Sequence, residues 1–228
     1  MLHVPFVIYN RRLFPERTSV DALTSHLDVL PTMLGLANAE TDLLRDRLQS
    51  RFSEARPFVG RNLAPSLTAA EGPAIAEEPI YFMTDDDVTR GPNQKSPLGK
   101  PYASVVQPNH IETVLLNVQP NQGQPKQLWK LSRYFDNVRF WSEPGVRDVT
   151  FYPSENGQAG AAPGWVPFVK TKPLPDEYEL YNVTSDPLET RNLAYSPAPE
   201  LSAIRQRMML ALEEQRRSKR LYPSQPSG

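Results

Sequence analysis

The alternation of hydrophobic and polar positions in the first 70 residues predicts a strand followed by two helices. Residues 4–9 form a continuous apolar run, which is typical of a strand buried on both faces of a larger sheet. Leucines then recur at steps of four, three and four between residues 21 and 37, which indicates an amphipathic helix; they are Leu23, Leu27, Leu30 and Leu34. A second helix is predicted over 42–52, behind a cap at Thr41 or Asp42, from Leu44, Leu48 and Phe52.

The first helix can begin at either of two positions. Pro31 cannot donate to the carbonyl four residues earlier and would break the ladder in mid-helix. The favoured start therefore has Asp28 as the N-cap and places Pro31 in the first turn. The alternative start has Ser25 as the cap, with Asp28 completing a capping box.

Beyond residue 70 the pattern predicts short strands and one long helix. A connection rich in Pro, Ala, Ser and Glu over 64–78 leads to strand-like runs at 80–83, 104–106, 112–118, 127–135 and 179–183. Alternation within 127–135 suits an antiparallel sheet with one covered face. A helix over 200–221 ends in basic residues, which suit its dipole, and should lie on this sheet through Leu201, Ile204, Met208, Leu212 and Leu221.

These elements predict a domain over 1–70, a smaller sheet domain over 71–221 and a disordered tail over 222–228. Residues 141–176 are rich in Gly and Pro and are expected to be a long loop, either a flexible insertion or a functional loop. The expected fold class is α+β for this chain, and α/β for the larger sheet to which its first part would belong.

Composition excludes several functional classes. The net charge of −1 gives no long-range field to attract nucleic acid or an anionic membrane. The sparse cations near the strands are expected to form a solvated face; they are Lys126, Lys130, Arg133 and Arg139. The absence of cysteine excludes disulfides and thiolate chemistry. No signal peptide or membrane span is recognisable, so a cytoplasmic location is the default expectation and the location stays undetermined.

Ionisable residues give only weak candidates for a site. The histidines His3, His26 and His110 lack the spacing of a metal motif; His26 is more simply explained at a helix start and His110 on a strand edge. The sequence also lacks the serine-hydrolase, phosphate-loop and dinucleotide fingerprints.

The adjacent acidic residues at 85–87 invite a test for calcium binding. If Asp85 opened a calcium loop, Arg90 would occupy the position that requires Gly, so the loop is excluded. Neighbouring residues of an extended chain point to opposite sides, and a turn or strand cap is the expected role. Arg90 would either neutralise this cluster or face an anion. The weak candidates for a pocket rim are Asp86, Arg90 and His110.

Four segments, taken in order, carry a resemblance to a known family. Residues 4–9, 25–37, 60–67 and 179–194 resemble the later half of sulfatases of the alkaline-phosphatase-like superfamily. The last of these segments is the most specific and resembles the C-terminal signature of the family. Within it, Asp186 and Pro187 are expected to start a turn that Glu189 and Asn192 cap.

The resemblance implies a sulfuric ester hydrolase that uses a formylglycine, made in a C/S-x-P-x-R motif, and a divalent cation, Ca²⁺ or Mg²⁺. Ser142 and Ser185 precede x-Pro but lack the Arg, so the motif is absent and no catalytic residue is carried over. The resemblance places the cation ligands in an upstream catalytic part. We therefore expect a C-terminal portion of a sulfatase-like hydrolase that is inactive alone, with that upstream part as its partner.

Two alternatives stay open. The first is a non-catalytic binding or assembly module that self-associates or pairs with a partner through an exposed sheet edge. The second is a fragment of a related phosphatase or phosphonate hydrolase, because these enzymes share the superfamily.

Overall fold

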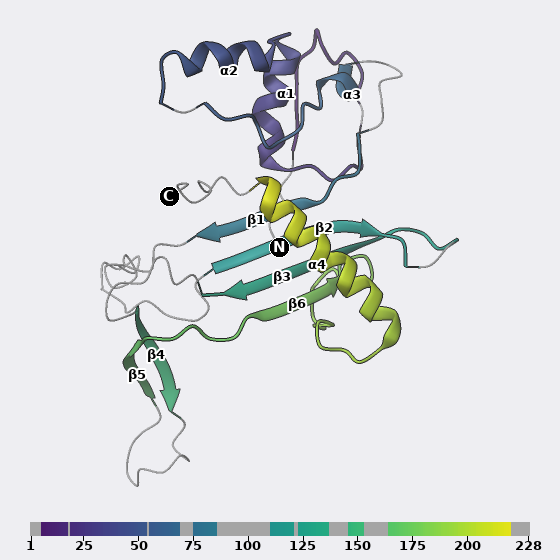
Figure 1. The fold of residues 1–228 in the computed structure, drawn as a ribbon. Helices are drawn as coiled ribbons and strands as arrows, with labels where there is room; N and C mark the ends of the chain where they lie inside the picture. Colours follow the sequence, from purple (N-terminus) through teal and green to yellow (C-terminus); the bar gives the residue numbers. More distant parts are fainter. Residues whose placement is uncertain are drawn as a thin grey trace. The chain divides into compact units, whose positions relative to one another are not determined.

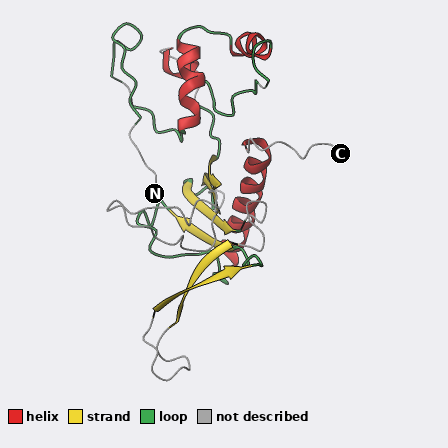
Figure 2. Ribbon diagram, turned by 90° about the vertical axis from the view of Figure 1, so that its left-hand side faces the viewer, coloured by secondary structure: helices red, strands yellow, loops and turns green. Residues whose placement is uncertain are grey.

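The computed structural model describes residues 6–17, 19–53, 55–68, 75–85, 110–120, 123–136, 146–152 and 164–219. The chain divides into two compact units, Met1–Ile80 (unit 1) and Tyr81–Gly228 (unit 2), whereas the sequence placed the change near residue 70. The fold class is α+β, with helices in both units and a four-stranded antiparallel sheet in unit 2 (Figures 1 and 2). The predicted disordered tail, 222–228, lies outside the described residues.

Unit 1 begins with a helical segment that uses both predicted starts. Ser25 caps the short 3-10 helix η1 (His26–Asp28) in a capping box with Asp28. Helix α1 (Val29–Leu36) then follows, with Asp28 as its N-cap residue and Pro31 in its first turn. Asp28 makes no side-chain cap bond to α1, because its carboxylate faces Ser25 and the loop at Arg61.

The buried face of this helical segment is not the predicted leucine stripe. Leu27 and Leu30 are 42% and 55% exposed, whereas Asp28, Pro31 and Thr32 are buried. The segment therefore docks on the rest of unit 1 through polar and small groups.

The remaining helices of unit 1 also differ from the prediction. Helix α2 (Thr41–Gln49) has Glu40 as its N-cap residue, without a side-chain cap bond, so the predicted caps are wrong; Phe52 lies beyond the helix end. Helix α3 (Ala64–Thr68) occupies part of the expected connection. It forms there because the Asn62 side chain accepts the hydrogen bond of the Ala64 N–H at its start.

The predicted N-terminal strand is wrong for residues 6–9. These residues have no regular secondary structure, and Val7 and Tyr9 are each 82% exposed. A strand needs a neighbour to take its backbone hydrogen bonds, and no described strand pairs with this segment. Residues 4 and 5 lie outside the described part.

The sheet of unit 2 contains β1 (Ile80–Asp85), β2 (His110–Val118), β3 (Gln127–Phe135) and β6 (Glu177–Asn182), in the order β1-β2-β3-β6. The predicted strands at 80–83, 112–118, 127–135 and 179–183 are confirmed, and 104–106 lies outside the described residues. Three apolar side chains face one another across β2, β3 and β6 and have no exposed surface: Val114, Leu131 and Leu180. They form the centre of the core.

Helix α4 (Pro199–Lys219) covers one face of the sheet and contacts β2 and β3 (Figure 1). Its buried side chains are spaced as one helical stripe: Ile204, Met208, Ala211, Leu212 and Gln215. The predicted helix is therefore confirmed, although Leu221 lies outside the described residues.

A second, two-stranded sheet occupies part of the predicted long loop. Strands β4 (Val146–Tyr152) and β5 (Gly164–Lys170) pair antiparallel, so the loop prediction over 141–176 is wrong for these residues. Both stretches are rich in β-branched and aromatic residues, which favour strands more than the neighbouring Gly and Pro oppose them. Because β3 and β6 are adjacent antiparallel strands, this hairpin is an insertion in their connection (Figure 1).

Candidate functional site

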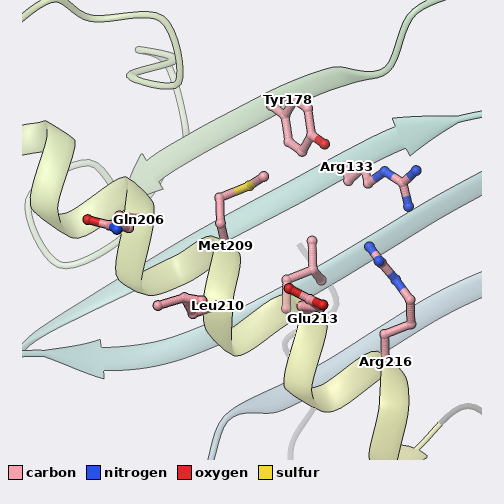
Figure 3. A pocket seen from close by; sticks show the side chains of 8 residues that line it. Arg133, Tyr178, Gln206, Met209, Leu210, Glu213 and Arg216 are labelled. Carbon is pink, nitrogen blue, oxygen red and sulfur yellow. The ribbon is translucent and has the colours of Figure 1, made fainter.

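A hollow of about 280 Å³ lies between α4 and the strands β3 and β6. Helix α4 supplies the flank next to its buried stripe, where residues three and four apart share a side. The sheet supplies an arginine and a tyrosine. Figure 3 shows the guanidinium ends of Arg133 and Arg216 pointing into the same region. The lining residues are Arg133, Tyr178, Gln206, Met209, Leu210, Leu212, Glu213 and Arg216.

A buried carboxylate, Glu112 of β2, lies beside this hollow and binds both arginines. Arg216 donates to it from Nε, at 3.0 and 2.8 Å, and from Nη2, at 2.6 Å. Arg133 Nη1 donates at 3.4 Å, and the Tyr81 hydroxyl donates to Oε1 at 3.1 Å. Glu112 has no exposed surface, so these donors replace its hydration and hold it as a structural anion.

Arg133 lies between two carboxylates. Its Nε donates to Asp176 at 2.7 Å, and its guanidinium carbon lies 4.2 Å from the centre of the Phe135 ring. Burial lowers the pKa of Arg133. The hydrogen bond and charge of Asp176, together with the charge of Glu112, raise this pKa by more than burial lowers it, so the net shift is upward. The cluster thus combines two cations with two anions, and its charged groups already bind one another.

The opposite face of β3 carries a second set of polar contacts, because neighbouring strand residues point to opposite sides. Lys130 pairs with Glu189 and lies 5.7 Å from the centre of the Tyr181 ring. Tyr134 donates to Glu179 at 2.6 Å. Burial and then this carboxylate raise the pKa of Tyr134 far above its usual value, so its phenol stays protonated and cannot act as a base near neutrality.

These contacts correct the predicted solvated face for Lys130 and Arg133, whereas Lys126 is exposed as expected. Lys130 and Arg133 have side chains only 16% and 21% exposed and are engaged in ion pairs. Arg139 lies outside the described residues.

Unit 1 contains a buried ion pair between Asp28 and Arg61. The Arg61 backbone N–H donates to Oδ1 of Asp28 at 2.7 Å, and Arg61 Nη2 donates to Oδ2 at 2.9 Å. Arg61 also donates to the carbonyls of Leu23 and Ala76. Burial raises the pKa of Asp28, but the bonds from Arg61 and Ser25 lower it more, so it lies below 3.8. This pair fastens the 60–63 loop to the start of α1.

Residues 186–192 form a turn next to the outer edge of β6. Asp186 accepts from the Thr190 hydroxyl at 3.1 Å and the Arg191 N–H at 3.0 Å, so Asp186 itself caps the turn. The prediction that Glu189 caps it is wrong, because Glu189 binds Lys130. Asn192 accepts from the N–H groups of Leu180 and Ala194, and donates to the Tyr178 carbonyl. Asn192 therefore satisfies backbone groups of β6 that a further strand would otherwise bind.

Of the predicted rim residues, His110 alone lies within the described part of the chain. Asp86 and Arg90 lie outside the described residues, and Asp85 is the last residue of β1. His110 begins β2 but has no exposed surface, and β2 is an inner strand, so its placement on a strand edge is wrong. Its ring packs 5.4 Å from that of Phe135, between centroids. His26 stands at a helix start, as expected.

Sequence reasoning missed Glu112, Asp176 and the pairing role of Arg216. A signal for Glu112 was present, because it shares the strand face of Val114 and Val118, where an apolar residue is expected. An acidic residue in such a position needs a cationic partner. The sequence alone does not tell which of the 25 Lys and Arg residues supplies it.

The described residues contain neither a group of metal ligands nor a membrane-spanning helix. Among them, no group of three or more His, Cys, Asp or Glu side chains is placed to hold a metal ion. In the same part of the chain, no helix has the length and apolar character needed to span a membrane.

No protein-family model matches the sequence, and no curated protein matches it either.

Proposed function

We propose that this chain is the C-terminal portion of a sulfatase-like hydrolase of the alkaline-phosphatase-like superfamily, and that it acts as a scaffold rather than as the catalyst. The observation that carries the proposal is the ordered resemblance of four segments, above all 179–194. Two residues of segment 179–194 have structural roles in unit 2, which supports the proposal. Asp186 caps the turn, and Asn192 binds the edge of β6.

The surface of unit 1 supports a role within a larger protein. Its described buried hydrophobic residues besides Pro31 are Leu63 and Ala64, so its apolar core is very small. Exposed hydrophobic side chains of this number favour packing against further protein. They are Phe6, Val7, Tyr9, Leu13, Val20, Leu27, Leu30, Met33, Leu43, Leu48, Phe52 and Phe58.

The chemistry of the chain supports a non-catalytic role. The 228 residues lack the C/S-x-P-x-R motif, so the proposed nucleophile would come from another part of the protein. Under this proposal the ligands of the family's divalent cation would lie in the upstream catalytic part. The arginines of the hollow bind Glu112 and Asp176, which leaves them poorly suited to stabilise charge on an ester.

Two measurements test the proposal. The coding sequence upstream of Met1 should contain a C/S-x-P-x-R motif, in the same frame or in an adjacent gene. Residues 1–228 alone should not hydrolyse 4-methylumbelliferyl sulfate with Ca²⁺ or Mg²⁺, whereas the protein joined to the upstream part should. Turnover by 1–228 alone, or an upstream sequence without the motif, would contradict the proposal. Phosphate and phosphonate esters of the same fluorophore, given to the joined protein, distinguish the related hydrolases.

An assembly module is the second candidate, and the edges of the sheet favour it. The 192–195 segment occupies the outer edge of β6, but no described strand pairs with the outer side of β1. Such an edge can pair with another chain. Size-exclusion chromatography with light scattering on 1–228 should then give a dimer or larger species. A monodisperse monomer at all concentrations would argue against self-association.

A further inference from the structure

We propose that a line of alternating charges, Asp176–Arg133–Glu112–Arg216, couples the base of the inserted β4–β5 hairpin to the C-terminal turn of α4. The four side chains follow one another as anion, cation, anion and cation, and the two arginines among them line the hollow. The first lies in the segment that returns from the hairpin, and the last lies in the final turn of a helix. This inference does not depend on the proposed function.

The hairpin end of the line has two attachments. Asp176 immediately precedes β6 and binds Arg133 Nε at 2.7 Å. The Leu174 N–H donates to the Asp136 carboxylate at 2.8 Å, and Asp136 immediately follows β3. These two contacts close the base of the insertion where the chain leaves and rejoins the sheet. Loss of the Asp176 contact therefore loosens the base without releasing it completely.

The helix end depends on charge rather than on apolar packing. The buried stripe of α4 ends at Gln215, and the residues that follow within the described helix are polar or charged: Arg216, Arg217, Ser218 and Lys219. Among them, Arg216 reaches the sheet, through three contacts of 3.0 Å or less to Glu112. This ion pair is thus a direct link between the last turn of α4 and the sheet.

Asp176 and Arg216 influence each other because both act on the charges of the inner pair, Arg133 and Glu112. Without the charge of Asp176, two guanidinium groups face one buried carboxylate, and the more exposed Arg216, at 29%, is displaced by their repulsion. Without Arg216, the buried Glu112 loses the nearer of its two described guanidinium partners, so it draws Arg133 away from Asp176. A coupling of this kind is reciprocal by thermodynamic necessity.

Hydrogen–deuterium exchange of the full chain tests the coupling. In Asp176→Asn, backbone amides at 216–219 should exchange about threefold faster or more, although the substituted side chain does not touch α4. In Arg216→Gln, the amides of Leu174, Asp176 and Glu177 should exchange faster to a similar degree, Pro175 having no amide hydrogen. In the double variant, one cation and one anion remain, so each acceleration should be smaller than the product of the single effects.

Matched controls separate coupling from general loosening. Glu213→Gln removes the Glu213–Arg217 pair on the same turn of α4 and should leave 174–177 unchanged. Glu189→Gln removes the Lys130 pair on the other face of β3 and should change neither reporter segment. If Arg216→Gln does not fold, the exchange of 216–219 in Asp176→Asn decides the test by itself. The inference is overturned if Asp176→Asn leaves 216–219 unchanged, or if the Arg216 variant leaves 174–177 unchanged.

Discussion

The substitution Asp28→Asn should destabilise unit 1 and leave unit 2 intact. Asn has nearly the size of Asp, so the change removes charge and acceptor capacity but leaves no cavity. The Asp28 carboxylate accepts from the Arg61 N–H at 2.7 Å, from Arg61 Nη2 at 2.9 Å and from the Ser25 N–H at 3.0 Å. An Asn side chain has one acceptor oxygen, so its NH₂ group must face at least one of these donors.

The magnitude follows from the burial of the two partners. Asp28 is 3% exposed in its side chain and Arg61 is 17% exposed, so the arginine regains water only in part. Charge-assisted hydrogen bonds contribute about 1.5–3 kcal/mol each, and their effects overlap, which gives an expected loss of about 2–4 kcal/mol. That loss is a large fraction of the stability of a unit with so few buried apolar side chains.

The stability difference between the wild type and Asp28→Asn should depend on pH in a definite direction. Because the pKa of Asp28 is lowered below 3.8 in the folded state, the unfolded chain binds more protons as the pH falls. The stability that this carboxylate contributes is therefore complete above pH 3.8, and it is lost as the pH falls through the lower folded value. The wild type should lose its advantage over Asp28→Asn in that acidic range, since Asn does not titrate.

Urea unfolding with two optical signals measures this effect. All three tryptophans, Trp129, Trp141 and Trp165, belong to unit 2, so fluorescence follows that unit and should not change. Far-UV circular dichroism also follows the helices of unit 1 and should show an earlier transition at neutral pH. The reasoning is refuted if the variant loses less than about 0.5 kcal/mol, the scale of an ordinary surface substitution. A loss that stays constant down to the acidic range would also refute it.

Three further substitutions test other contacts. Met208→Ala removes a fully buried side chain and should cost unit 2 about 2–4 kcal/mol, seen as an earlier fluorescence transition; an unchanged midpoint would contradict the packing of α4 on the sheet. Gly60→Ala should destabilise unit 1 by about 1–3 kcal/mol in circular dichroism, because its Cβ would lie 1.9 Å from the Leu27 carbonyl oxygen. Asn192→Ala leaves the buried Leu180 N–H without its acceptor and should lower unit 2 stability by about 1–3 kcal/mol. Asn192→Asp keeps the acceptor and should lose less.

Local periodicity predicts the elements of unit 2 because their pattern and their environment agree. The helix over 199–219 presents one apolar stripe, and the sheet of the same unit covers it. The strands at β2 and β3 have partners nearby in sequence, so alternation is enough to find them. The β4–β5 hairpin escaped prediction because the Gly and Pro residues around it outweighed its two short β-rich stretches in the reading of 141–176.

The charged cluster could not be predicted because its members are distant in sequence. Glu112 and Arg216 are 104 residues apart, and their contact depends on how α4 crosses β2. Periodicity places residues on a face but does not say which residue of another element meets them. The alternation within β2 puts Glu112 on the face of Val114 and Val118, a signal that was missed, and the packing of α4 decides its partner.

The wrong burial predictions for unit 1 are all of one kind: residues predicted to be buried are exposed. Residues 6–9 and the leucine stripe were predicted to be buried, and Val7, Tyr9, Leu27 and Leu30 are exposed instead. These apolar side chains do not stabilise unit 1 by burial. Its described contacts are mainly polar, such as the ion pair between Asp28 and Arg61. These exposed apolar side chains would be covered if unit 1 packed against further protein. The same patterns that failed as predictions for unit 1 therefore favour the proposal that it packs against a catalytic part.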